Sequence, residues 1–215
     1  YFVGLHTSGV GDYTAYTPHI TDINGDGKVD LIYTHAGASG AVVYTGLGKG
    51  DGTFGALTQV LNYGGFGGLS GHTPQIVDLN GDGIADLLYT AANSAGAFAY
   101  QWLGNGDGTF KAGSPAIAAT EFGGFATYVP QVVDLNGDGV VDLLYTYAGT
   151  SGAYAYSWLG NGDGSFRSGA AGLVATEFGN FTGYTAQTVD LNGDGIVDLL
   201  YTYAGASGAY AYKWI

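Results

Sequence analysis

The chain has 215 residues with 18 acidic and 5 basic side chains, a formal net charge of −13 at pH 7, and no cysteine. This charge leaves no basic face for nucleic acid, and no apolar run is long enough to insert into a membrane. The lack of cysteine excludes disulfides and thiolate metal sites, and 18 Tyr and 10 Phe exclude a disordered chain.

An acidic segment of nine residues occurs four times along the chain. It begins at Asp22 and returns at Asp78, Asp134 and Asp190, each time 56 residues later and without an insertion. Four copies at one constant spacing are not expected by chance, so the sequence predicts tandem repeats of one unit. We predict a single domain of residues 1–215, with units of about 9–64, 65–120, 121–176 and 177–215, the last one completed by residues 1–8.

Each unit predicts four short antiparallel strands, which in the third unit are residues 131–134, 141–147, 152–159 and 173–178. The third of these alternates Tyr and Trp on one face with Ala and Ser on the other. A layer of large side chains against a layer of small ones suits sheets that stack face to face. Four strands per unit are typical of a propeller blade, so the predicted fold is an all-β, β-propeller-like repeat of four 56-residue blades.

The N-terminal residues 1–6 align with the segment that leads into the fourth strand of the other units. We expect them to pair with residues 209–214 and so to complete the last blade within the same chain. The same spacing allows the N-terminal strand to be exchanged with a neighbouring subunit instead. Exchange would give a filament or a larger ring.

The acidic segments predict metal sites, because oxygen donors at positions 1, 3, 5 and 9 and a carbonyl at position 7 suit Ca²⁺. Three carboxylates within nine residues repel one another without a cation, and four ions would change the net charge from −13 to about −5. About four Ca²⁺ ions, one per repeat, are therefore expected. Extracellular Ca²⁺ concentrations suit such modules, so a secreted or cell-surface location is expected. The predicted ligands are Asp22, Asn24, Asp26, Lys28 and Asp30; Asp78, Asn80, Asp82, Ile84 and Asp86; Asp134, Asn136, Asp138, Val140 and Asp142; and Asp190, Asn192, Asp194, Ile196 and Asp198.

These loops, of the form D-x-[DN]-x-D-G-x-x-D, make the sequence resemble the FG-GAP or VCBS repeat family over nearly the whole chain. The fuller unit of residues 121–134, together with residues 161–166, is similar to lectins of the Psathyrella velutina type. The resemblance implies a propeller, Ca²⁺, and extracellular adhesion or carbohydrate binding.

Two functions remain open at this point, and neither is enzymatic. One is a module that binds a glycan or a surface protein, and the other is a subunit of an extracellular fibre or sheath that assembles with copies of itself. The four histidines do not repeat, and no nucleophile–base pair or phosphate-binding loop is present, so the chain is not expected to be an enzyme. Aromatic residues at repeat-equivalent positions are the candidates for ligand binding: Phe122, Phe125, Tyr128, Phe178, Phe181 and Tyr184.

Overall fold

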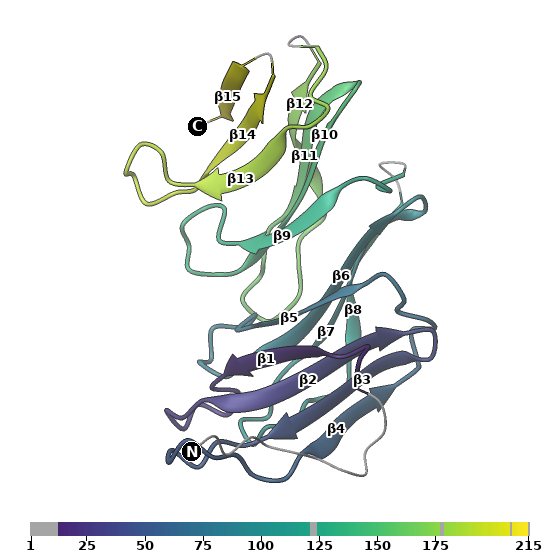
Figure 1. The fold of residues 1–215 in the computed structure, drawn as a ribbon, viewed down its shortest axis with the longest axis vertical. Coiled ribbons are helices and arrows are strands. Elements are labelled where there is room, and N and C mark those ends of the chain that lie inside the picture. Colours follow the sequence, from purple (N-terminus) through teal and green to yellow (C-terminus); the bar gives the residue numbers. More distant parts are fainter. Residues whose placement is uncertain (1–12, 121–123, 177–178, 207, 215) are drawn as a thin grey trace. The chain divides into compact units, whose positions relative to one another are not determined.

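The computed structural model describes residues 13–120, 124–176, 179–206 and 208–214, which form fifteen strands in four antiparallel sheets (Figure 1). The first sheet contains β1 (Thr17–Thr21), β2 (Asp30–Gly37), β3 (Gly40–Gly46) and β4 (Thr58–Tyr63). The second contains β5 (Thr73–Val77), β6 (Asp86–Asn93), β7 (Gly96–Trp102) and β8 (Ser114–Ala119). The third contains β9 (Val129–Val133), β10 (Asp142–Gly149), β11 (Gly152–Trp158) and β12 (Ala170–Ala175). The fourth contains β13 (Thr185–Val189), β14 (Asp198–Gly205) and β15 (Gly208–Trp214).

The sheets confirm the predicted all-β fold and the four-stranded repeat. Each sheet is a meander in which strands that follow one another in the chain are hydrogen-bonded neighbours. The fourth sheet has three strands among the described residues, and the N-terminal segment that was expected to complete it lies outside them. Closure of the sheets into a ring, and the grouping of the repeats into one domain, therefore stay predictions.

Tight turns link the second and third strands of every sheet. In the third sheet the turn ends at Gly152, whose φ of +126° lies in the region that favours glycine. A Cβ atom there would also approach the carbonyl oxygen of Ala175 to within 2.4 Å. The equivalent glycines of the other sheets, Gly40, Gly96 and Gly208, also have positive φ, so the third strand of each sheet begins with the same backbone conformation.

The predicted layers of large and small side chains are present in the third sheet. Antiparallel pairing places Tyr145 opposite Tyr156 and Leu143 opposite Trp158, so these large side chains share one face. Ala153 and Ala155 lie on the other face, and they are 0% and 2% exposed. Trp158 is only 3% exposed, so both faces of β11 are buried at these positions, whereas Val129 on β9 and Val174 on β12 are exposed.

Buried tyrosines connect successive sheets. The hydroxyl of Tyr89 on β6 donates a hydrogen bond of 3.1 Å to the carbonyl of His35 on β2. The hydroxyl of Tyr201 on β14 donates one of 2.9 Å to the carbonyl of Tyr154 on β11. Tyr145 makes the corresponding bond of 2.8 Å to the carbonyl of Phe98. All three tyrosines are fully buried, so each one brings its polar end to a backbone acceptor while its ring fills the core.

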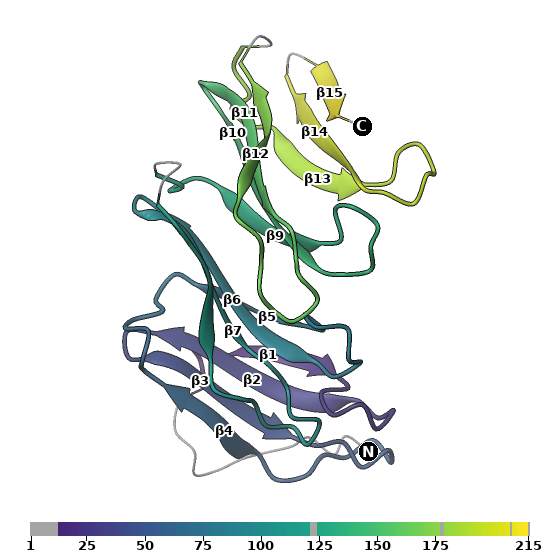
Figure 2. The same ribbon diagram turned by 180° about the vertical axis from the view of Figure 1, so that it is seen from behind.

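By its internal contacts the chain divides into two compact units. One comprises the described parts of Tyr1–Asp78, Asp82–Ala91 and Ala99–Ala116, and the other comprises Leu79–Gly81, Ala92–Phe98 and Ile117–Ile215. In the first unit Trp102, Tyr89 and Ile32 are at the centre of the core. In the second, Phe181 and Tyr201 pack with Ala153 and Ala175. Figure 2 shows β13–β15 beside the third sheet within this second unit. Among the described residues there is no helix long and apolar enough to cross a membrane.

Candidate functional site

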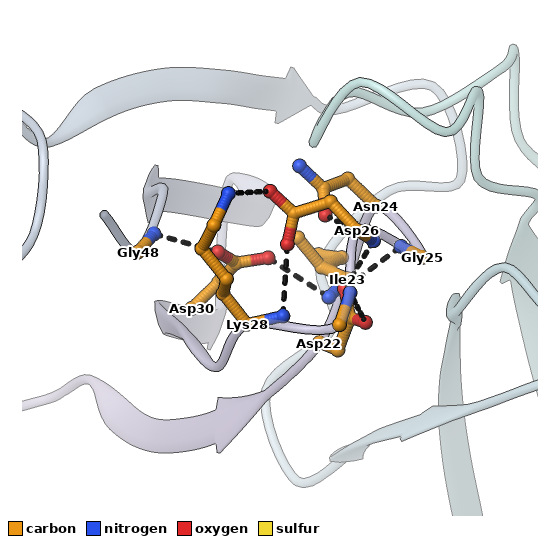
Figure 3. A network of polar contacts seen from close by, with 9 residues as sticks. Asp22, Ile23, Asn24, Gly25, Asp26, Lys28, Asp30 and Gly48 are labelled. Carbon is orange, nitrogen blue, oxygen red and sulfur yellow. Dashed lines mark hydrogen bonds and ion pairs between the residues drawn. The ribbon is translucent and has the colours of Figure 1, made fainter. Parts of the chain in front are cut away.

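The first acidic loop, between β1 and β2, is organised by the carboxylate of Asp22 (Figure 3). One carboxylate oxygen accepts the N–H of Gly25 at 2.8 Å, and the other accepts the N–H of Gly27 at 2.7 Å. Both glycines have positive φ, which turns their amides toward the carboxylate. The third and fourth loops repeat this arrangement around Asp134 and Asp190, and Gly83 donates to Asp78 in the second loop.

The last aspartate of each loop has a different role. Asp30 is fully buried, and its two oxygens accept the N–H of Ile23 at 2.9 Å and the N–H of Gly48 at 2.7 Å (Figure 3). Asp142 makes the same pair of bonds to Leu135 at 2.8 Å and to Gly160 at 2.7 Å. This carboxylate therefore links the acidic loop to the glycine-rich turn that follows the third strand. Sequence reasoning treated it as equivalent to the other acidic positions and missed the link.

The remaining loop positions are partly or fully exposed and hydrogen-bond to one another. The N–H of the residue at position 7 donates to the aspartate at position 5 in every loop, as Val140 does to Asp138 at 2.8 Å. The side-chain amide of Asn136 also donates to Asp138, at 2.9 Å. These hydrogen bonds to Val140 and Asn136 lower the pKa of Asp138 below its usual value.

The first loop differs from the others at position 7, which is occupied by Lys28. Its ammonium group lies 2.9 Å from a carboxylate oxygen of Asp26 and forms an ion pair with it (Figure 3). Hydrogen bonding to Lys28 lowers the pKa of Asp26, and the pKa of Lys28 is raised in return. The first loop thus contains a positive charge of its own, where the other loops have Ile84, Val140 and Ile196.

The chemistry of the loops fits Ca²⁺, since all predicted donors are oxygen atoms. A carboxylate oxygen that accepts one N–H still has a second lone pair for a cation. Burial raises the pKa of Asp142, and the nearby charges of Asp138 and Asp134 raise it further, so these carboxylates repel one another. In the part of the chain that the structure describes, no three acidic or histidine side chains gather closely enough to enclose an ion. Positions 1, 3 and 5 and the carbonyl at position 7 would hold Ca²⁺, and the buried aspartate at position 9, which bonds backbone amides, stays a predicted ligand.

The aromatic candidates for ligand binding separate into two groups. Phe125 and Phe181 are each 1% exposed and lie in the core, so their contact with a ligand stays a prediction from the sequence alone. Their rings pack against Trp158 and Trp214, respectively, on the aromatic faces of the third and fourth sheets. Phe122 and Phe178 lie outside the described residues. Only Tyr128 and Tyr184 are partly exposed.

Tyr184 lines a pocket of about 220 Å³ in the second unit. The other walls include the hydroxyl-bearing Thr127, Thr146 and Thr185, with Val129, Ala148 and Ala186 as apolar lining. The ring of Tyr184 is held by stacking on Tyr203, with ring centroids 5.2 Å apart. The pocket thus combines one fixed aromatic wall with the exposed threonines Thr127 and Thr185, while Thr146 is 2% exposed and bonds its hydroxyl to Gln131 and to the carbonyl of Val129. Sequence reasoning missed the threonines, although Thr146 recurs at 56-residue spacing as Thr34, Thr90 and Thr202.

Comparison with known families agrees with this repeated loop-and-sheet structure. The FG-GAP-like repeat matches residues 22–89, 78–145 and 134–201. The chain belongs to the FG-GAP-like repeat family. Each match extends from the first aspartate of one acidic loop to the buried tyrosine on the second strand of the next repeat. The family resemblance noted in the sequence is confirmed.

Solved structures place the fold of this FG-GAP-like protein among larger proteins. A lectin of Agrocybe aegerita that recognises non-reducing terminal N-acetylglucosamine is 27% identical, with a TM-score of 0.64. The alignment covers 92% of this chain and 51% of the lectin, so the chain spans about half of its neighbour's length. A chain of the Photorhabdus luminescens Tc holotoxin pore is 22% identical, with a TM-score of 0.64, over 94% of this chain and 9% of the toxin chain. No match was found among curated proteins.

Proposed function

We propose that this chain is a non-enzymatic glycan-binding module, stabilised by Ca²⁺, of an extracellular or cell-surface protein. The pocket beside Tyr184 carries this proposal. Sugars bind to proteins through the faces of aromatic rings and through hydrogen bonds to their hydroxyl groups, and this pocket offers both kinds of contact. Its volume of about 220 Å³ is smaller than the roughly 300–1,000 Å³ of a drug-sized site, which suits a single sugar residue.

The similarity to the Agrocybe aegerita lectin supports the same choice of ligand. At 27% identity over 92% of this chain, it makes a glycan ending in N-acetylglucosamine the first ligand to test. In this proposal the four sheets are blades of a propeller-like ring, and an N-terminal strand completes the fourth sheet. The alternative function that the sequence suggested, a subunit of a self-assembling extracellular fibre or sheath, stays open.

Calorimetric titration with an oligosaccharide that ends in N-acetylglucosamine tests the glycan proposal. The wild-type chain is expected to bind it, and both Tyr184→Ala and Thr185→Val are expected to lose most of the binding, because each removes one type of contact from the pocket. Thr182→Val is the matched control, since Thr182 is exposed and does not line the pocket. Wild-type affinity that is unchanged in both pocket variants would refute this site. A glycan array without binding to any sugar would refute the glycan function.

The calcium part of the proposal has its own test. Four acidic loops with matching oxygen donors are expected to bind Ca²⁺ and thereby to raise the melting temperature, since a ligand that binds the folded state stabilises it. Mg²⁺ at the same concentration is the control, because it demands a smaller and more regular octahedral shell. A melting temperature that is equal in Ca²⁺ and in chelator would count against bound calcium without affecting the glycan test.

A further inference from the structure

Adjacent sheets in this protein meet through one type of contact. In the second unit the alanine face of the third sheet, with Ala153 and Ala155 at 0% and 2% exposure, is covered where the fourth sheet follows. The fourth sheet turns its aromatic face to this contact, and the buried Tyr201 donates its hydrogen bond to the carbonyl of Tyr154. A face of small side chains thus receives the aromatic face of the next sheet.

Among the residues that the structure describes, none buries the alanine face of the fourth sheet. Ala209 and Ala211 are exposed, although the equivalent Ala153 and Ala155 are buried. Leu191, in the loop before β14, is 42% exposed. Its repeat equivalents Ile23 and Leu79 are 1% and 2% exposed, respectively. The fourth sheet therefore has the alanine half of the contact without the aromatic half.

The first sheet shows the opposite deficit, on its aromatic face. Ile20 on β1 is 67% exposed, whereas the equivalent Ile76 and Val132 are partly buried. Tyr33 is also partly exposed, although the equivalent tyrosines of the other three sheets are fully buried. The centroid of its ring lies 5.3 Å from that of Tyr13. The first sheet therefore has the aromatic half of the contact without the alanine half.

We infer that two copies of this chain assemble head to tail, with the aromatic face of the first sheet of one copy on the alanine face of the fourth sheet of the other. The contact continues one that the chain already makes between its own sheets. Such a heterologous contact joins two different faces. It gives a closed ring when the rotations from one copy to the next add up to a full turn, and a filament when they do not. The alignment covers 51% of the Agrocybe aegerita lectin, so two copies of this chain would match that lectin in length, and a two-chain ring is the assembly to test.

Charge complementarity supports this pairing. Between the first and second repeats, Thr45 donates its hydroxyl to the carbonyl of Gly108, at 3.3 Å, in the turn that contains Asp107. The 56-residue register replaces Thr45 by Lys213 on the fourth sheet, and replaces Gly108 by Gly52, next to Asp51, on the first repeat. Lys213 and Asp51 are both exposed. The only cation on the alanine face of the fourth sheet would thus meet an acidic turn of the second copy, as far as the described residues show.

Light scattering on the wild-type chain tests the assembly, and the result does not depend on whether glycan or Ca²⁺ binds. The expected mass is twice the 21.9 kDa of one chain. A mass of one chain at every concentration would refute the proposal, and open-ended polymers would refute the two-chain ring in favour of a fibre.

A substitution on the alanine face locates the contact. Ala211→Arg places an unpaired charge in it and is expected to weaken the dimer about a hundredfold or more. Because Ala211 is exposed in the single chain, the fold should tolerate this change, and a thermal melt checks that it does. Ala112→Arg, in the exposed loop before β8, is the control and should remain dimeric. Dissociation of both variants, or of neither, would refute the proposed face.

Cysteine pairing distinguishes two chains from a ring closed within one chain. The native chain has no cysteine, so Lys213→Cys and Asp51→Cys can be made in separate preparations and mixed under oxidising conditions. A disulfide-linked heterodimer that exceeds the two homodimers is expected. The double variant forming only an internal disulfide, at the mass of one chain, would instead show a ring closed within the monomer and would overturn the inference.

Discussion

Asp142→Asn tests whether the last aspartate of the acidic loop is a backbone cap or a calcium ligand. The carboxylate is 0% exposed and accepts the N–H groups of Leu135 and Gly160 at 2.8 and 2.7 Å. The amide of asparagine can accept only one of them and turns its own N–H₂ toward the other. One buried N–H then loses a charge-assisted bond, which costs about 2–3 kcal/mol. For a chain of this size the melting temperature should fall by about 4–12 °C.

The assay is a calorimetric melt in chelator and again in excess Ca²⁺. If Asp142 acts as a cap, the destabilisation is present in chelator and changes little when Ca²⁺ is added. Asp138→Asn, in the same loop but exposed, is the matched control and should have little effect in chelator. A destabilisation by Asp142→Asn that appears only in Ca²⁺ would refute the cap and make Asp142 a metal ligand, as the sequence pattern had suggested.

Three further predictions follow from the described contacts. Tyr201→Phe leaves the carbonyl of Tyr154 without its 2.9 Å donor and should lower the free energy of unfolding by about 1–2 kcal/mol in urea titrations, whereas Tyr203→Phe should change it by less. Lys28→Ile removes the cation paired with Asp26 and should raise the Ca²⁺ affinity of the first loop about three- to fivefold by calorimetry, a change that Lys111→Gln should not reproduce. The pKa values of Asp138, Asp190 and Asp163 are lowered by hydrogen bonds, so the stability that they contribute is present above their unfolded pKa of 3.8 and is lost as pH falls below it. The melting temperature should therefore fall as the pH is lowered from about 5 to below 3.8, partly offset by Asp142, whose pKa is raised, and an unchanged value would contradict this balance.

The fold was predictable because two sequence periods agree. The 56-residue register set the number of repeats, and the alternation within β11 set which residues share a face. The structure confirms both, with Ala153 and Ala155 on one buried face and Trp158 on the other. What the register could not show is the hydrogen bond from Tyr145 to Phe98, because the acceptor is a backbone carbonyl that any residue provides.

The candidate sites were predictable only in part. Asp134 and Asp142 look equivalent as residue types, but one organises an exposed loop and the other is buried below it. Spacing alone does not distinguish an oxygen that faces solvent from one that faces two amides. The same limit applies to Phe181 and Tyr184, two aromatic residues three positions apart. Only Tyr184 reaches the pocket, because Phe181 lies in the core with Tyr201.

Nearly identical sequences in different surroundings give the strongest argument for assembly. Residues 142–158 and 198–214 differ only at Thr150, which is Ala206 in the later segment, and at Ser157, which is Lys213. Ala153 is nevertheless buried while Ala209 is exposed. A sheet face that stays in water is usually covered by charged side chains. A row of alanines that matches an aromatic layer has no advantage on such a face. The fourth repeat has the same contact face as the third and one lysine on it, Lys213, which the repeat register places opposite an acidic turn. That combination is explained by a covered face, and a second copy supplies the matching cover.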